Sequence, residues 1–172
     1  MKKGYKKGFT AVELLVVIAV IAVLAALAMF SLTRAQRSAR DTQVFQDMKT
    51  LQTALEFYYT ENGHYPAVAD GAVWSNPSET GLAKDLSPFL TQMPESPRAD
   101  QHQAYSYLVN SAGDAYYLST QLENSKHDAL TNDVDGSVGG DSWSEITSLN
   151  EVHTNATVNC DDSTGLYCVS NK

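Results

Sequence analysis

The side chains best suited to bind a metal ion lie in an acidic cluster between residues 128 and 141. The segment 132–136 places two carboxylates at alternate positions before a glycine, and the segment 139–141 adds a third acid after a flexible turn. Calcium takes about six to eight oxygen ligands, which a bending loop of Asp and Gly residues supplies. The spacing is only the start of an EF-hand pattern, because Glu145 is not where the bidentate ligand belongs. The alternative is a solvated acidic turn. The predicted calcium ligands are Asp133 and Asp135, followed by Asp128 and Asp141.

The two cysteines are the next candidates for chemistry. Cys160 and Cys168 are the only cysteines, and a bond between them closes a nine-residue loop. The chain-entropy estimate for such a loop is roughly 2 to 3 kcal/mol of stabilisation. We predict a structural disulfide, which requires an oxidising compartment.

Other side chains give no sign of catalysis. The sequence holds no HExxH or other zinc-ligand spacing, no G-x-S-x-G turn for a nucleophilic serine and no P-loop for a nucleotide. We therefore predict that the chain is not an enzyme. The histidines are spread singly, at His64, His102, His127 and His153.

One carboxylate lies inside a long apolar segment. Leu14–Phe30 is a run of 17 residues drawn only from Ala, Val, Ile, Leu, Met and Phe, and in the 24 residues of Phe9–Leu32 only Thr10, Glu13 and Ser31 are polar. As a helix this segment extends about 36 Å, enough to cross a bilayer core of about 30 Å. A carboxylate at membrane depth is costly unless it is paired or reaches water. The position of Glu13 therefore predicts either a partner or a side chain that reaches the interface.

A cleaved secretory signal is the main alternative to a membrane span. The leader is basic, and Ala26-Leu27-Ala28 is a small-residue triplet that suits signal peptidase. The apolar segment is longer than usual for such a signal, however, and it contains Glu13. A buried core helix is a poorer alternative, because a chain of this size can hardly cover it on every side.

The helical pattern continues beyond the apolar segment. Neither Gly nor Pro occurs between Gly8 and Gly63, so nothing there breaks a helix. Asn62-Gly63 and Pro66 supply the stop signals. The whole helix spans roughly 80 Å. Apolar residues at steps of four and three predict that its second half packs on one face, through Val44, Met48, Leu51, Leu55 and Tyr58.

Residues 67–172 are expected to form the domain that this helix covers. A short helix is predicted over 81–92, and the runs 104–109 and 115–120 read as a hairpin with Tyr105, Tyr107 and Val109 on one face. The acidic tail from Asp114 onward, in which Asn, Asp, Gly and Ser cluster at 124–142, is expected to be rich in loops. The predicted fold class is α+β, with a long N-terminal helix, transmembrane in its first half, packed on a small antiparallel β-sheet head.

Charge limits the possible partners. The chain carries 20 acidic and 12 basic residues, and four of the basic ones are Lys2, Lys3, Lys6 and Lys7. Because a surface this acidic repels the phosphate backbone of nucleic acids, we expect no direct nucleic-acid partner. Arg34, Arg37 and Arg40 follow the apolar segment, where they are expected among lipid head groups or against acids of adjacent subunits.

Two blocks of sequence resemble a known family. The segment 8–15, Gly-Phe-Thr-Ala-Val-Glu-Leu-Leu, after a lysine-rich leader and before the apolar run, resembles the class III signal of type IV pilins and type II secretion pseudopilins. The block 51–66 is similar to the end of the long helix in that family, especially in proteins similar to the major pseudopilin. Many relatives have a helix-breaking proline where this chain has Phe30.

The resemblance implies how the chain is processed and assembled. Prepilin peptidase would cut after Gly8 and the new amine of Phe9 would be methylated, which divides the chain into a leader (1–8), a transmembrane and filament-core helix (9–33) and an extracytoplasmic head (34–172). Glu13 would pair with the Phe9 amine of a neighbouring copy. The precursor would be a single-pass protein of the cytoplasmic membrane with its head outside, and the product a helical homopolymer at the cell surface.

The resemblance leaves the assembly system open. A type IV pilus-like filament is the main expectation, with pilus or secretion machinery as partner. The alternatives are a pseudopilin of a type II secretion or DNA-uptake system and, in a different class, a membrane-anchored or secreted soluble domain with an unidentified activity. Relatives similar to the major pseudopilin carry a calcium loop before a tryptophan, here Trp143, which supports the calcium prediction. Asn155 lies in a glycosylation sequon of low specificity.

Overall fold

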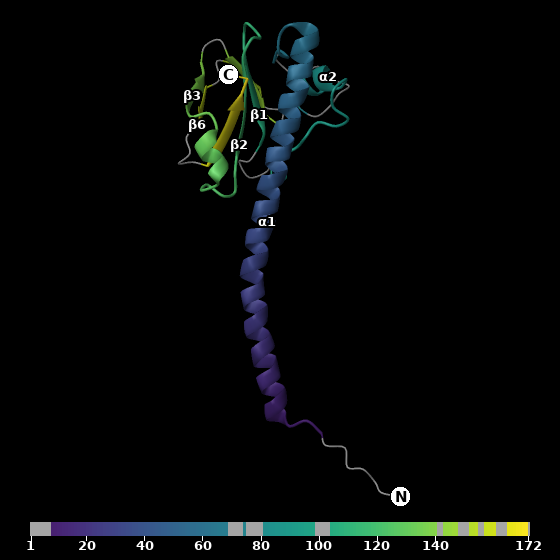
Figure 1. The fold of residues 1–172 in the computed structure, drawn as a ribbon, viewed down its shortest axis with the longest axis vertical. Coiled ribbons are helices and arrows are strands. Elements are labelled where there is room, and N and C mark those ends of the chain that lie inside the picture. The colour runs from purple at the N-terminus through teal and green to yellow at the C-terminus, as the bar shows by residue number, and fades with distance from the viewer. Residues whose placement is uncertain are drawn as a thin grey trace, which may run out of the picture. The chain divides into compact units, whose positions relative to one another are not determined.

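The fold is described from a computed structural model, in residues 8–68, 74, 81–98, 104–140, 143–147, 152–154, 157–160 and 165–171. The chain divides into two compact units, residues 1–37 and residues 38–172. Helix α1 (Ala11–Asn62) begins in the first unit and ends in the second (Figure 1). Each unit is described by itself.

The first unit is an apolar stretch of α1 that its own chain leaves uncovered. The large apolar side chains that the structure describes in this unit are more than half exposed, from 51% for Val17 to 90% for Phe9. By length and composition α1 is able to cross a membrane, with a window of mean hydropathy 3.0 that is not buried in the protein. An apolar helix that is exposed to this extent must be covered by lipid or by another protein surface.

The second half of α1 is one-sided, as the spacing of its apolar residues predicts. Val44, Met48, Leu51 and Leu55 are at most 4% exposed and belong to the main core. The helix ends where the sequence predicts, because Gly63 adopts a positive φ of 76° and its N–H donates to the Tyr59 carbonyl at 2.8 Å. The prediction of an amphipathic helix up to Asn62 is confirmed.

A five-stranded antiparallel sheet packs against this half of α1. Its strand order is β5-β4-β1-β2-β7. A separate antiparallel pair joins β3 to β6. The strands of the large sheet are β1 (Ser106–Asn110), β2 (Tyr116–Gln121), β4 (Trp143–Thr147), β5 (Val152–Thr154) and β7 (Leu166–Ser170). Those of the small sheet are β3 (Gly136–Gly139) and β6 (Thr157–Cys160).

The predicted hairpin is confirmed, with bounds moved by one or two residues. β1 and β2 pair antiparallel, with Tyr107 opposite Leu118 and Val109 opposite Tyr116. Tyr105, Tyr107 and Val109 are all buried in the core that contains α1. The fold class predicted from the sequence, α+β with a long helix on a small antiparallel sheet, is thus observed.

Two local predictions differ from the structure. The helix expected over 81–92 is the single turn α2 (Leu82–Leu86). It ends early because Pro88 has no N–H for the next helical bond, and Phe89 and Leu90 instead donate to the Leu86 carbonyl in a turn. The acidic tail, expected to be rich in loops, contains a 3-10 helix, η2 (Asp128–Asn132), and strands β3 to β7.

A polar clamp joins α1 to the segment after β2. Asp41 is buried, and its carboxylate accepts hydrogen bonds from the backbone N–H groups of Glu123 at 3.0 Å and Asn124 at 3.2 Å. Arg40 makes a bidentate contact with the Glu123 carboxylate, which also accepts from Arg98 at 3.3 Å. Arg40 therefore pairs within its own chain, a partner that the sequence did not predict.

The clamp predicts that stability depends on pH through Glu123. The Arg40 guanidinium, by hydrogen bonding, holds the pKa of the Glu123 carboxyl below its ordinary value of 4.5. Because the pKa is lowered in the folded state, this stabilisation is present above the ordinary value and is lost as the pH falls through the folded pKa. We expect Glu123→Gln to lower the Tm of the full chain in detergent at neutral pH by about 2 to 4 °C.

The exposed Glu95 provides a matched control for this prediction. Glu95→Gln should leave the Tm unchanged at neutral pH. The deficit of Glu123→Gln should shrink in acid, where the wild-type carboxyl is protonated as well. A deficit that stays constant from neutral pH into acid would contradict an electrostatic role for Glu123.

Candidate functional site

The predicted carboxylate Glu13 lies in the first turn of α1 and has a local partner. Its Oε2 accepts hydrogen bonds from the Thr10 backbone N–H at 2.7 Å and from the Thr10 hydroxyl at 2.8 Å. In return, the Glu13 backbone N–H donates to the Thr10 hydroxyl oxygen at 3.2 Å. This reciprocal arrangement is a capping box, which satisfies N–H groups that the helix itself leaves unpaired.

The capping box places the Glu13 carboxylate where its negative charge is stabilised. A carboxylate in the first turn faces the positive end of the helix dipole, which favours its charged form. Two donors from Thr10 also replace part of the hydration that the carboxylate would lose at membrane depth. The carboxylate is therefore held at the helix start in a defined orientation. Prediction from the sequence did not include Thr10, although Thr-x-x-Glu before an apolar run is the signature of this cap.

Gly8 and Phe9 immediately precede the cap. Phe9 is 90% exposed, and a Cβ placed on Gly8 meets no atom within 4 Å. The peptide bond between the two residues is therefore accessible, next to a structured helix start. Residues 1–7, the rest of the predicted leader, lie outside the described residues.

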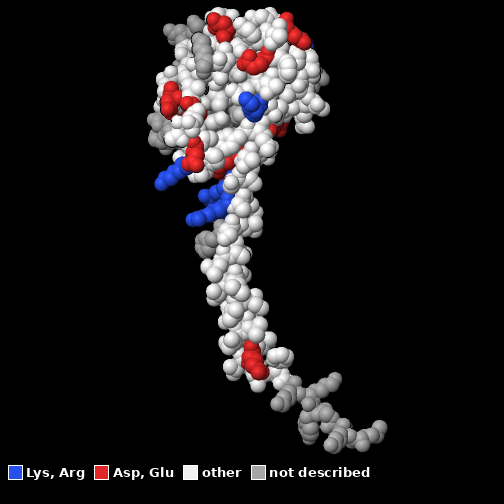
Figure 2. All heavy atoms as spheres, in the orientation of Figure 1, with Lys and Arg blue, Asp and Glu red and all other residues white. Residues whose placement is uncertain are grey.

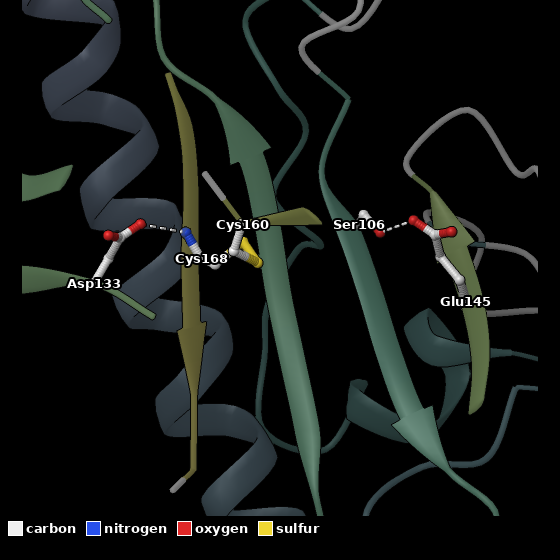
Figure 3. Close-up of a disulfide and its surroundings, with 5 residues drawn as sticks. All are labelled: Ser106, Asp133, Glu145, Cys160 and Cys168. Carbon is white, nitrogen blue, oxygen red and sulfur yellow. Dashed lines mark hydrogen bonds between the residues drawn. A yellow bond between two sulfur atoms is a disulfide. The ribbon is translucent and has the colours of Figure 1, made fainter. Parts of the chain in front are cut away.

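The predicted disulfide between Cys160 and Cys168 is present and buried. It ties β6, in the small sheet, to β7, at the edge of the large one (Figure 3). At the same edge the Cys168 N–H donates to the Asp133 carboxylate at 2.8 Å, and the Val134 N–H donates to the Cys168 carbonyl at 3.0 Å. A further contact joins the paired strands β1 and β4, in which the Ser106 hydroxyl donates to the Glu145 carboxylate (Figure 3).

The predicted calcium ligands are not gathered into one site in the part of the chain that the structure describes. Asp133 bonds to the Cys168 backbone, whereas Asp128 and Asp135 are exposed. Among the described residues, no three His, Cys, Asp or Glu side chains are grouped to hold a metal ion. Asp141 and Asn155 lie outside the described residues. Calcium binding stays a prediction.

Two family models match the chain, one over the first half of α1 and one over the second half of α1 and part of the sheet. Residues 3–29, which contain the capping box, match the prokaryotic N-terminal methylation motif. Residues 31–148, which include the second half of α1 and strands β1 to β4, match the family described as type II secretion system (T2SS), protein G. No curated protein and no solved structure matches the chain significantly. Because the second match alone covers more than half of the chain, this protein belongs to the type II secretion protein G family, a family of filament subunits of the pilin and pseudopilin class.

Proposed function

We propose that this protein is a structural subunit of a type IV pilus-like filament and that it polymerises through the first half of α1. The observation that supports this most directly is the exposed apolar surface between Phe9 and Leu32. In the precursor this surface would be covered by lipid, and in the filament by the same surface of other copies. The subunit would thus move between two apolar surroundings without entering water.

Processing at Gly8 would prepare the helix for this transfer. The leader contains four lysines, which favour retention of the uncut N-terminus on the cytoplasmic side. Cleavage by prepilin peptidase would remove them and leave a single amine on Phe9, which would then be methylated. The capping box of Thr10 and Glu13 lies directly after this new terminus.

In the filament, the Glu13 carboxylate would pair with the Phe9 amine of a neighbouring copy. In the separate subunit the carboxylate is oriented by two hydrogen bonds from Thr10, so little side-chain ordering is needed before it meets the amine. The pair neutralises both charges in an apolar core, where an unpaired charge is costly. Assembly would therefore select for a subunit that has already been cleaved.

Residues 1–8 would be the leader, 9–33 the membrane and filament-core helix, and 34–172 a head outside the cytoplasmic membrane. The disulfide of Cys160 and Cys168 supports an oxidising location for the head. Prepilin peptidase, the assembly machinery and further copies of the chain are the implied partners.

Among filament systems, we propose a secretion pseudopilus. The match of residues 31–148 to protein G of type II secretion favours it over an adhesive pilus. A DNA-uptake filament is disfavoured for this subunit because the acidic head repels phosphate.

Deletion of the gene, combined with electron microscopy of sheared surface material, tests this proposal. In a pseudopilus system we expect the deletion to leave exported substrates inside the cell envelope. Overproduction of the chain should then give surface filaments that mass spectrometry identifies as this protein. Abundant filaments at native expression, with secretion intact after deletion, would instead identify a pilus.

A further inference from the structure

Met29 is an oxidisable side chain on the uncovered apolar surface of α1. It is 71% exposed, whereas Met48 and Met93 are 1% and 7% exposed in the core of the head. Met1, the remaining methionine, belongs to the predicted leader. Both cysteines are joined in the disulfide, so no free thiol of the chain competes for an oxidant. Among the residues that the structure describes, Met29 thus carries the one accessible thioether.

In the proposed orientation, Met29 lies near the outer edge of the membrane. It is about 27 Å along the helix from Ala11, the first residue of α1, and a bilayer core is about 30 Å thick. Polar groups follow at once, because the Thr33 hydroxyl donates to the Met29 carbonyl at 3.1 Å and Arg34 is the first charged residue after Glu13. Figure 2 shows the visible face of this stretch of α1 as uncharged, between acidic atoms near its start and basic atoms beyond it. A small oxidant in the water outside the membrane therefore reaches Met29 without crossing the bilayer core.

Oxidation of this thioether changes the character of the surface. A two-electron oxidant such as hydrogen peroxide transfers one oxygen atom to the sulfur and leaves as water, and the product is methionine sulfoxide. The new S–O group is a hydrogen-bond acceptor on a side chain that was apolar. At the edge of the membrane this acceptor is able to bond to water. Between the apolar helices of a filament it would be buried without a donor, which is costly.

We propose that Met29 is a reversible oxidation site that controls entry of the subunit into the filament. The reduced subunit assembles, and the oxidised subunit stays in the membrane until a methionine sulfoxide reductase restores the thioether. In that step a dithiol is oxidised to a disulfide and the oxygen leaves as water. Packing in the filament covers the sulfur, so oxidation is restricted to the subunit in the membrane. The effect on assembly rests on the proposed function, whereas the oxidation site requires only the membrane-inserted subunit.

Peptide mass spectrometry of cells treated with hydrogen peroxide tests the site. Trypsin places each methionine of the cleaved chain in its own peptide, 9–34, 41–49 or 85–98, so the three sulfoxide fractions are measured separately. In the membrane pool we expect at least about fivefold more sulfoxide at Met29 than at Met48 or Met93, because oxidation follows exposure. In sheared filaments Met29 should be protected like the two buried methionines. Equal oxidation of all three in the membrane pool would overturn the site.

Substitutions at Met29 test the effect on assembly. Met29→Leu keeps the surface apolar and removes the sulfur, whereas Met29→Gln carries a polar group in place of the sulfoxide. We expect peroxide to lower the filament yield of wild type about tenfold, and Met29→Gln to show a similar loss without peroxide. Met29→Leu should stay within about twofold of untreated wild type under both conditions, because this exchange conserves volume. Met93→Leu is the matched control, since it removes a buried thioether and should leave assembly as sensitive to peroxide as in wild type.

The outcomes separate this inference from the proposed function. Immunoblots of membranes establish that each variant is inserted and cleaved before its filaments are counted. Equal losses on peroxide treatment in wild type and Met29→Leu would refute control of assembly through Met29 and leave the filament function intact. Failure of the untreated wild-type chain to form filaments at any expression level would refute the filament function and the control of assembly with it. The sulfoxide fractions in the membrane pool would still decide whether Met29 is the oxidation site.

Discussion

Replacement of Glu13 by alanine is expected to abolish filament assembly while the protein still enters the membrane, is cleaved and folds. In the proposed filament the substitution leaves the Phe9 amine of a neighbour without its carboxylate in an apolar core. The loss of one partner of a buried pair costs about 3 to 5 kcal/mol. At about 1.4 kcal/mol for each factor of ten, filament yield should fall at least about a hundredfold. Quantitative immunoblots of sheared filaments and of membranes measure the two quantities separately.

The capping box makes the alanine variant ambiguous by itself, because alanine removes both the charge and the cap that Glu13 forms with Thr10. Glu13→Gln resolves this, since glutamine supports a capping box but carries no charge. If the ion pair drives assembly, both variants fail. If Glu13→Gln assembles like wild type, the carboxylate acts through the helix cap alone and the pairing mechanism is wrong.

Thr10 adds an independent check on the same site. Thr10→Val removes the hydroxyl that donates to Glu13 at 2.8 Å but leaves the backbone donor and the charge in place. It should therefore lower assembly less than either Glu13 variant does. A Thr10→Val defect as large as that of Glu13→Ala would show that the orientation of the carboxylate matters as much as its presence.

Sequence reasoning succeeded where the determinants are local. The absence of Gly and Pro between Gly8 and Gly63 and the regular spacing of Val44, Met48 and Leu51 were enough to predict α1 and its buried face. The β1–β2 hairpin follows from two alternating segments around a short turn. The cap at Thr10 could also have been predicted, because the Thr-x-x-Glu spacing is local, but in a long apolar segment the single charged residue, Glu13, is the more conspicuous feature.

Sequence reasoning failed where the partners are distant in the chain. β4 pairs with β1, and β7 with β2, across tens of residues, and short polar strands such as Val152–Thr154 carry little pattern of their own. The pairing of Arg40 with Glu123 joins residues 83 positions apart. Asp133 is a similar case. Its place in an acidic loop predicts a calcium ligand, which stays a prediction, whereas the hydrogen bond that its carboxylate accepts from the Cys168 backbone N–H was not predicted, because that contact depends on how the 133–134 segment meets the edge of β7.

Replacement of Gly8 by valine is expected to leave the chain in the membrane as the uncut precursor. A side chain at position 8 meets open space in the structure, because a Cβ there has no neighbour within 4 Å, and Gly8 is not among the glycines with positive φ. The substitution should therefore not disturb folding or membrane insertion. The expected block arises at the peptidase, whose site suits a small residue on the leader side of the cleaved bond.

Intact-mass measurement and N-terminal sequencing distinguish this processing from the action of signal peptidase. The wild-type protein should begin at Phe9, and Gly8→Val should retain Met1 or start at Lys2 in nearly all molecules. Ala28→Leu is the control, because it blocks a signal-peptidase site after Ala28 but leaves cleavage after Gly8 intact. A mature chain that begins at Met29, in wild type and in Gly8→Val alike, would mean that the apolar segment is a removable signal. The head would then be released without α1's apolar half, and neither the Glu13 pair nor a helical filament core would exist.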